Sequence, residues 1–342
     1  MILTPDSPTL SRNIEDYPEG IIIPIDKPYR WTSADVIRKV KYAAIRHFGK
    51  KNLKVGHAGT LDPLATGVLL VCIGKATKLA EALQSHDKEY VAGVTFGATT
   101  PSYDLEKGID RFFPYDHITY GSVAEALPGF IGEQDQIAPL FSAKSVDGVR
   151  AYELARRLYK ASVRGEVISD LRPSDDGHTV DGMSQPTSPI SEASLDETAR
   201  ELIRVSKINI TELELIEFTS GLSSPESGLG RGEENRATPL AAGGGTRSEG
   251  VGGVVLSPST QSASNRINVT DNSALGLPRA VIRMACSKGT YVRAFARDLG
   301  EKLGSGAHLD SLQRSRSGEF RMENALTVDQ AIALLASPST SN

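Results

Sequence analysis

The spacing of hydrophobic and polar residues predicts a chain that contains both helices and strands. Apolar residues recur at helical spacing between Thr32 and Gly49 and within 290–303, and Gly304 is expected to end the second helix. Alternating or continuous apolar runs predict strands at 68–73, 89–97, 204–218 and 279–286. Further helices are expected at 75–84, at 327–337 and at 122–130, the last with a break at Pro128. Within 141–158 we expect a strand, a turn at Asp147–Gly148 and then a helix.

Two segments lack this periodicity. Residues 165–199 carry eight acids against Arg172, and residues 219–276 contain eleven glycines, ten serines and three prolines. We expect both to be flexible insertions, since such compositions do not bury enough apolar surface to fold. They flank the strand at 204–218, so the sequence predicts an N-terminal tail at 1–20 and one interrupted domain at 21–337.

The composition is that of an ordinary globular protein rather than a membrane or secreted one. The chain has 342 residues, of which 39% are hydrophobic and 23% charged, and no apolar run is long enough to span a bilayer. The N-terminus lacks the layout of a signal peptide. Two cysteines, Cys72 and Cys286, lie in apolar runs and are expected to be buried thiols. These features predict a cytoplasmic protein.

The distribution of charge leaves a nucleic-acid partner possible although the formal net charge is −4. Residues 165–199 have a net charge of −7 and residues 219–276 of −1, which leaves +4 on the remainder. Local basic clusters suit a phosphate backbone, while a solvated helix face explains part of them equally well. They are Arg38, Lys39, Lys41, Arg46, Lys50, Lys51 and Lys54, followed late in the chain by Arg314, Arg316 and Arg321.

Several common types of site are excluded by spacing. The glycines of 56–74 do not form a P-loop, no Cys/His pairs have zinc spacing, and no G-x-S-x-G stretch is present.

Three stretches carry side chains that could form a catalytic site. The loop KVGHAGTLDPLATG (54–67) holds one carboxylate, Asp62, which taken alone is also explained by an Asx turn before a proline. Tyr90 begins a predicted strand, where a packing role is more common. In CSKGTYVRAFARDLG (286–300), Arg293 lies in the first turn of a predicted helix, against the helix dipole. That position favours a partner carboxylate, and a solvated arginine is the alternative.

These stretches resemble the bacterial TruB-type tRNA pseudouridine synthases. The matching segments follow the order of the family and cover about residues 20–164 and 277–337 and the strand at 204–218; GHAGTLDPLATG is the most specific of them. The others are IDKPYRWTSADVIRKVK, DKEYVAGVTFGATTPSYD, FSAKSVDGVRAYELAR and CSKGTYVRAFARDLGEKLGSGAHLDSLQRSRSGEF. The resemblance implies the α+β pseudouridine synthase fold, with one long mixed, largely antiparallel bent sheet, flanking helices and a central active-site cleft.

The resemblance also implies an activity, the isomerisation of uridine to pseudouridine at tRNA position 55 in the T arm by base flipping. Asp62 would be the nucleophile, Arg293 would pair with it and favour its ionised form, and Tyr90 would stack on the target base. The residues expected to bind substrate are His57, which would fill the vacated space in the arm, Tyr291 and Leu312 at the uracil pocket, and Lys27, whose role stays open. Attack on the ribose, attack on the base and removal of a ribose proton are not distinguished. The isomerisation transfers no electrons or external group, so no cofactor or metal is expected.

Two features depart from the family pattern: the insertions, and the absence of an expected C-terminal PUA domain. The expected partner is tRNA, with no membrane or protein partner, and the protein is expected to be a monomer. Two other functions stay open, a catalytically silent RNA-binding or tRNA-folding protein and a synthase with a shifted RNA target. The joint presence of Asp62, Tyr90 and Arg293 argues against the first.

Overall fold

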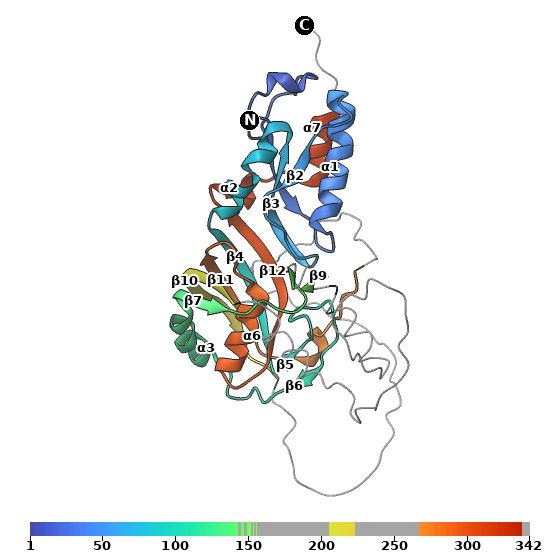
Figure 1. The fold of residues 1–342 in the computed structure, drawn as a ribbon. Coiled ribbons are helices and arrows are strands. Elements are labelled where there is room, and N and C mark those ends of the chain that lie inside the picture. Colours follow the sequence, from blue (N-terminus) through green and yellow to red (C-terminus); the bar gives the residue numbers. More distant parts are fainter. Residues whose placement is uncertain are drawn as a thin grey trace, which may run out of the picture.

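A nine-stranded mixed sheet forms the centre of the molecule (Figure 1). The computed structural model describes residues 1–142, 145–146, 149–151, 153, 155, 205–222 and 267–336. Neighbouring strands follow the order β1-β3-β12-β4-β11-β10-β7, with β2 beside β3 and β13 beside β12. Their bounds are β1 Ile21–Lys27, β2 Val55–His57, β3 Ala65–Ile73, β4 Lys88–Phe96, β7 Gly132–Gln136, β10 Ser206–Thr219, β11 Arg279–Cys286, β12 Ala307–Ser317 and β13 Phe320–Arg321. The pairing is antiparallel except between β12 and β3, which confirms the expected α+β class and largely antiparallel sheet.

Helices cover the two ends of this sheet. Helix α1 packs on α7, β2 and β3, and α7 lies beside β1, whereas α6 packs on β12 and β4, and α3 lies near β10 (Figure 1). The α-helices are α1 Ser33–Phe48, α2 Ala80–Ser85, α3 Tyr120–Ala126, α6 Val292–Lys302 and α7 Val328–Ala336. Short 3-10 turns are η1 Ile14–Asp16, η2 Gly74–Leu79, η3 Leu127–Phe130, η4 Ser273–Leu275 and η5 Met322–Asn324, and two small hairpins pair β5 Ala98–Thr99 with β6 Arg111–Phe112 and β8 Ser145–Val146 with β9 Val149–Arg150.

Local sequence signals define both ends of helix α1. The Thr32 hydroxyl accepts a hydrogen bond from the Asp35 amide while the Asp35 carboxylate accepts one from the Thr32 amide, which is a complete capping box. Gly49 ends the helix with a φ of 63°, a left-handed conformation that glycine adopts without strain. Val36 and Val40 on its inner face are fully buried. The helix predicted between Thr32 and Gly49 is therefore confirmed.

The strand β11 shows how the core is built. Ala280, Ile282, Met284 and Cys286, which were expected on one face, are all fully buried. Each buried methylene contributes about 0.8 kcal/mol, so this alternation fixes which face of the strand meets the core. Cys286 and Cys72 are buried free thiols, as expected.

The structure differs from the sequence pattern at several elements. The single helix predicted at 75–84 is a 3-10 turn, η2, followed by the short α2, and Gly74 before it has a φ of 65°. Strands β1, β7 and β12 were not predicted from periodicity. Gly304, which was expected to end the helix at 290–303, has a left-handed φ of 65° just after α6 ends at Lys302.

The N-terminal segment packs on the domain rather than extending from it. Leu3 is fully buried and Leu10 is 1% exposed, and both belong to the main core. Ile2 forms a parallel bridge with Ile22 of β1, and the terminal ammonium donates to the carbonyl oxygen of Gly20 at 2.9 Å. The residues expected to be a tail therefore contribute to the core.

The two expected insertions lie mostly outside the described residues. This holds for all of 165–199 and for 223–266. The ends of the second segment are described and packed: the Thr270 amide donates to the Leu105 carbonyl and the Leu222 amide to the Gly276 carbonyl, both at 2.8 Å. Residues 219–222 and 267–276 consequently belong to the folded domain, at its surface.

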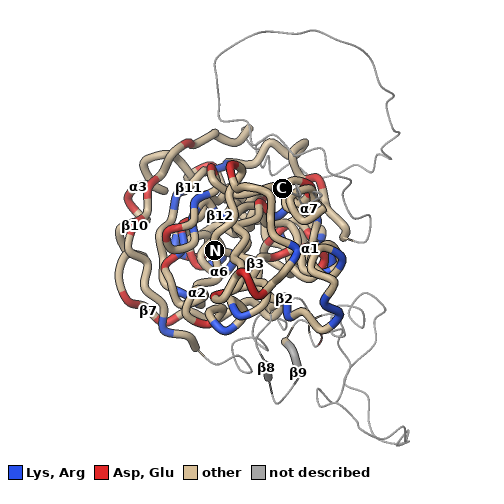
Figure 2. Tube along the Cα trace, turned by 90° about the horizontal axis from the view of Figure 1, so that it is seen from above, with Lys and Arg blue, Asp and Glu red and all other residues tan. Residues whose placement is uncertain are grey.

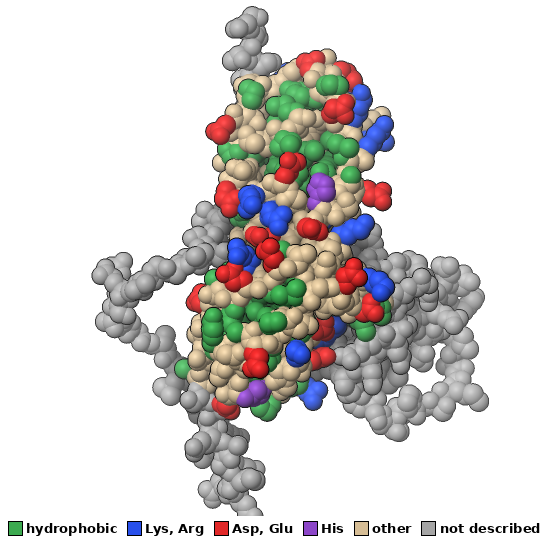
Figure 3. Space-filling model, turned by 90° about the vertical axis from the view of Figure 1, so that its left-hand side faces the viewer, with side chains coloured by type: hydrophobic (Ala, Val, Ile, Leu, Met, Phe, Trp, Pro, Cys, Tyr) green, Lys and Arg blue, Asp and Glu red, His purple; other side chains and the backbone are tan. Residues whose placement is uncertain are grey.

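Charged side chains are spread unevenly over the surface. Lys and Arg positions gather along α1 and the segment that leads into β2 (Figure 2). The side face in Figure 3 carries a band of acidic and basic side chains across its middle, between areas of exposed hydrophobic side chains. None of the helices formed by the described residues is both long and apolar enough to cross a bilayer.

Candidate active site

The loop that carries Asp62 connects β2 to β3 and is anchored to the start of α1. The hydroxyl of Ser33, the first residue of α1, accepts from the Leu61 amide at 3.0 Å and donates to the Leu61 carbonyl at 3.2 Å. The Ala65 amide donates to the Asp62 carbonyl at 3.1 Å. Leu61 is 5% exposed and lies in the main core. These contacts fix the backbone on both sides of Asp62.

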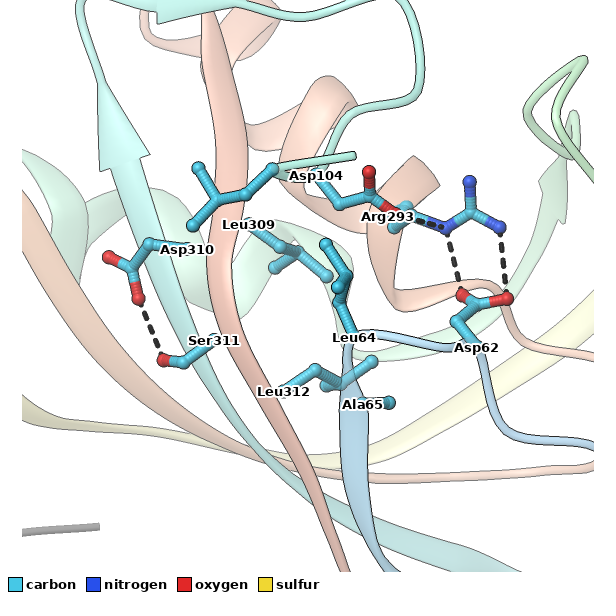
Figure 4. A pocket seen from close by; sticks show the side chains of 10 residues that line it. Asp62, Leu64, Ala65, Asp104, Arg293, Leu309, Asp310, Ser311 and Leu312 are labelled. Atoms are coloured by element: carbon cyan, nitrogen blue, oxygen red, sulfur yellow. Dashed lines mark hydrogen bonds and ion pairs between the residues drawn. The ribbon is translucent and has the colours of Figure 1, made fainter. Parts of the chain in front are cut away.

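Asp62 forms a bidentate ion pair with Arg293 of α6 (Figure 4). The Arg293 Nε donates to Oδ2 at 2.9 Å and Nη2 donates to Oδ1 at 3.2 Å. The side chain of Asp62 remains 40% exposed while that of Arg293 is only 6% exposed. The expected ion pair is thus present, with the carboxylate reachable from solvent and the cation held behind it.

Arg293 is fixed by further contacts besides Asp62. Its Nη1 donates to the Ser102 carbonyl at 3.0 Å and its Nη2 to the Phe141 carbonyl at 2.9 Å. The Asp104 carboxylate lies 3.7 Å from Nε. Burial alone would lower the pKa of Arg293, but the charges of Asp62 and Asp104 outweigh it and raise that pKa, so the guanidinium stays charged.

Asp104 is a buried second carboxylate that sequence reasoning missed. Burial raises its pKa, while the charge of Arg293 opposes the rise. Its Oδ1 accepts from the Ser102 hydroxyl at 2.6 Å and from the Glu106 amide at 2.9 Å. The neighbouring Tyr103 has a φ of 54°, a left-handed conformation that is uncommon for a non-glycine residue.

A side chain from another part of the chain holds the residue before α6. Tyr291 occupies the cap position without a side-chain cap of its own. The Gln136 side chain of β7 holds the backbone of this residue, accepting from the Tyr291 amide at 2.8 Å and donating to the Tyr291 carbonyl at 3.2 Å. Arg293 therefore sits near the positive end of the helix dipole, and the two carboxylates beside it offset that repulsion.

An open cleft with about 930 Å³ of empty space brings most of the predicted residues together. Its lining includes five of the seven predicted site residues, which are Asp62, Tyr90, Tyr291, Arg293 and Leu312. Three further basic residues line it as well: Lys88, Lys288 and Arg314. A smaller pocket of about 270 Å³ shares the ion pair with the cleft and is also bordered by Leu64, Leu309 and Asp310, among others (Figure 4).

Tyr90 lies on β4 at the floor of the cleft, opposite Met284 of β11 and Arg314 of β12. It is 9% exposed. Burial raises its pKa, although the charge of Arg314 opposes the rise, and the phenol is therefore neutral at ordinary pH. The pKa of Tyr291 is also raised, by burial and by the charge of Asp62.

Lys27 lies behind the Asp62 loop and does not line the cleft. It is fully buried, and its ammonium donates to the carbonyls of Trp31 at 2.5 Å, Pro28 at 3.0 Å and Pro63 at 3.2 Å. Burial lowers its pKa to about 7, although the charge of Asp62 opposes this. Since Pro63 directly follows Asp62, this lysine holds the loop from the protein interior.

His57 ends β2, outside the residues that line the cleft. Its ring is half-buried, and its Nδ1 is buried without a hydrogen-bond partner. Burial lowers its pKa, and the charge of Arg314 adds to this effect, which favours the neutral imidazole.

The structure corrects the reading of Arg314 as part of an exposed basic cluster. Its side chain is 2% exposed, so it is not available to a phosphate backbone in the way an exposed arginine would be. Burial also lowers the pKa of Lys88 to about 8, helped by the charge of Arg314. The sequence did not show that Arg314 and Lys88 are buried, because both residues stand among other charges.

Among the described residues, no group of three or more His, Cys, Asp or Glu side chains is placed to hold a metal ion.

Comparisons of the sequence with known proteins agree on one family. Residues 46–169 match the model of the N-terminal domain of TruB family pseudouridylate synthases. The chain is 38% identical over 314 residues to a protein of Phocaeicola vulgatus named tRNA pseudouridine synthase B, with 92% of each protein covered. Proteins of the same name from Bacteroides thetaiotaomicron and Deinococcus radiodurans are 38% and 32% identical, over 91% and 90% of this chain and 91% and 77% of those proteins.

Solved structures with a similar course of the chain include one described as a Cbf5-Nop10-Gar1 complex, at a TM-score of 0.47 and 20% identity. Another is an H/ACA RNP bound to a substrate RNA containing 2′-deoxyuridine, at a TM-score of 0.46 and 18% identity. Each match covers 96% of this chain, which spans 58% and 60% of those two solved chains.

Proposed function

Because the chain belongs to the TruB family of pseudouridylate synthases, we propose that it isomerises uridine to pseudouridine in tRNA, at position 55 of the T arm. The observation that carries the assignment to this site is the bidentate pair of Asp62 and Arg293 at the edge of a cleft. A carboxylate that is partly exposed, held by a buried guanidinium and next to an open space of about 930 Å³, suits a reaction on an extruded nucleotide.

The reaction needs a group that acts on the sugar or the base and then leaves. The bond between C1′ and N1 breaks, the uracil turns, and a bond between C1′ and C5 forms; the proton on C5 is lost and N1 gains one. Asp62 is proposed as the catalytic carboxylate. Attack on the ribose, attack on the ring and removal of a ribose proton all use its carboxylate oxygens, to which the guanidinium of Arg293 donates two hydrogen bonds.

The other cleft residues are proposed to hold the base. Tyr90 is neutral and lies on the cleft floor, where its ring can stack on the uracil. Leu312 and Tyr291 offer apolar and aromatic walls within the same lining. The uracil would therefore turn between these side chains while Asp62 acts beside it.

Two predicted residues are proposed to act from outside the cleft. His57 lies five positions before Asp62 and is favoured in its neutral form by burial. A neutral, half-buried ring can occupy the space that an extruded base leaves in the arm. Lys27 is proposed to support the loop through the Pro63 carbonyl rather than to touch the substrate.

The cellular setting follows from the substrate. A protein that modifies tRNA is proposed to work in the cytoplasm, where mature tRNA is found, and to do so as a monomer. Size-exclusion chromatography with light scattering checks the monomer.

Mapping pseudouridine in tRNA from cells that lack this protein tests the function. We expect the modification to be missing at position 55 and restored by the wild-type gene. A full level of modification at this position without the protein would contradict the proposal, whereas loss at another position would show a shifted target.

A further inference from the structure

Arg314 is the largest fully buried side chain among the described residues. It projects from β12, the strand between β3 and β4. Its Nε donates to the Val68 carbonyl at 2.7 Å, its Nη1 to the Thr60 carbonyl at 3.3 Å and its Nη2 to the Gly59 carbonyl at 3.4 Å. The first acceptor lies after Asp62 in the chain and the other two lie before it, so one guanidinium contacts both arms of the loop.

The charge of Arg314 has no carboxylate partner in the described part of the chain, since none of the ion pairs formed there includes it. A buried cation is costly unless its donors are satisfied. Here backbone carbonyls satisfy them, and each of these carbonyls belongs to the segment 59–68. The guanidinium fork is therefore bonded to the backbone on both sides of Asp62, and the side chain it contacts besides is that of Tyr90.

The backbone of Arg314 meets the same segment a second time. Gly67 of β3 stands in register with Arg314 in the parallel pair and has a φ of 96°. A Cβ built on Gly67 would lie 2.3 Å from the Arg314 carbonyl oxygen, so only glycine permits this approach. The side chain and the main chain of Arg314 together hold β3 and its preceding loop against β12.

The geometry points to Arg314 as a positioning residue for Asp62: it fixes the loop 59–68 so that the carboxylate meets Arg293 at the edge of the cleft. This inference adds a positioning residue to the proposed function, and its test by reaction rates rests on that function. Lysine in its place would keep the charge but could not span acceptors on both sides of the loop, because its ammonium is a point donor without the planar fork.

Arg316 provides a matched control on the same strand. Its side chain is 25% exposed, it lies 3.9 Å from the Glu89 carboxylate, and its Nη1 donates to the Gly318 carbonyl at 3.2 Å. None of these contacts touches the Asp62 loop. R316K therefore makes the same chemical change two residues away without altering the loop.

The first measurement needs no substrate. Hydrogen exchange is followed at the Leu61 and Ala65 amides, which donate to the Ser33 hydroxyl and to the Asp62 carbonyl. We expect exchange at both amides to be about tenfold faster in R314K, because the loop opens locally more often, and unchanged in R316K. Equal exchange in R314K and wild type would overturn the inference.

The second measurement separates positioning from binding. We expect R314K to lower the single-turnover rate of pseudouridine formation roughly 100-fold, as a small displacement of a catalytic group does, with the Kd for tRNA within about threefold. R316K should stay within about threefold of wild type in both. A wild-type rate in R314K, or a loss explained wholly by weaker binding, would contradict the positioning role.

R314Q, which keeps a planar donor group without the charge, is carried through both measurements so that failure of one variant to fold does not end the test. Exchange intermediate between wild type and R314K supports the inference, and wild-type exchange in R314Q overturns it. A wild-type protein that forms no pseudouridine would contradict the proposed function, whereas the exchange data would still decide the role of Arg314.

Discussion

One nitrogen atom of Arg293 serves two carboxylates: its Nε lies 2.9 Å from an Asp62 oxygen and 3.7 Å from an Asp104 oxygen. Asp62 faces the cleft and is partly exposed, whereas the side chain of Asp104 is only 10% exposed. The buried carboxylate thus balances part of the arginine's charge, and the exposed one is left to react.

We predict that D62N abolishes isomerisation. The amide keeps the shape of the carboxylate but not its charge, so the rate should fall by more than roughly 1000-fold, as when a central catalytic group is removed. Binding of tRNA, measured by filter retention, should stay within about tenfold. Turnover at the wild-type rate would exclude Asp62 from the mechanism.

D104N should weaken both the fold and the rate. It removes one of the two carboxylates that hold the buried Arg293, so we expect a loss of about 1–3 kcal/mol in the free energy of unfolding and a rate roughly tenfold lower. Urea unfolding and single-turnover kinetics measure these effects. D298N, which changes a residue of α6 that pairs with Arg297, serves as the control and should leave the rate unchanged.

Lys27 should make stability depend on pH in a defined direction. Its pKa is about 7 in the folded state and 10.5 in an unperturbed lysine, so between these values the unfolded chain binds more protons and stability rises with pH. The free energy of unfolding of wild type relative to K27M should therefore increase from pH 7 to pH 9, by up to about 1.4 kcal/mol per pH unit. A difference that stays flat over this range would show that Lys27 does not titrate there.

Replacement by alanine should strongly destabilise the protein at one glycine and be tolerated at another on the neighbouring strand. At Gly67 the left-handed φ and the nearby Arg314 carbonyl both exclude a Cβ, so G67A should cost more than about 3 kcal/mol. At Gly56 a Cβ would meet nothing within 4 Å, and G56A should change stability by less than about 1 kcal/mol. Chemical denaturation of both variants decides this, and similar losses in the two would contradict the argument from Gly67.

The bounds of a deletion should decide whether it is tolerated. Replacing 223–266 by a short Gly-Ser bridge should leave isomerisation largely intact. Replacing 219–276 should destabilise the protein, because it removes the bond from Thr270 to Leu105 and the bond from Arg30 to the Ile267 carbonyl at 2.7 Å. Melting temperature and single-turnover rate are compared in both, and equal behaviour would show that the described ends do not contribute.

The sequence predicted those elements whose signals are local. Helix α1 carries its own capping box and terminal glycine, and β11 alternates so clearly that its buried face could be named in advance. The family resemblance predicted five residues that line one cleft, and three of them, Asp62, Tyr291 and Arg293, come from the loop around Asp62 and the start of α6.

Features that depend on distant partners could not be predicted in this way. Strand β12 is rich in polar residues, and its central place in the sheet follows only from β3 and β4 on either side. Arg314 and Arg316 are the same residue two positions apart, yet only Arg314 is fully buried. Asp104 lies in a segment without periodicity, and its burial beside Arg293 follows only from the folded chain.

The place of β12 in the middle of the sheet has a consequence for synthesis on the ribosome. The strand that separates β3 from β4 is translated after both of them, and Arg293 follows Asp62 by 231 residues. A nascent chain that has not yet emerged through residue 317 leaves β3 and β4 without their shared neighbour. The residues of the reactive centre therefore come together on a complete sheet only after the chain has emerged through residue 317.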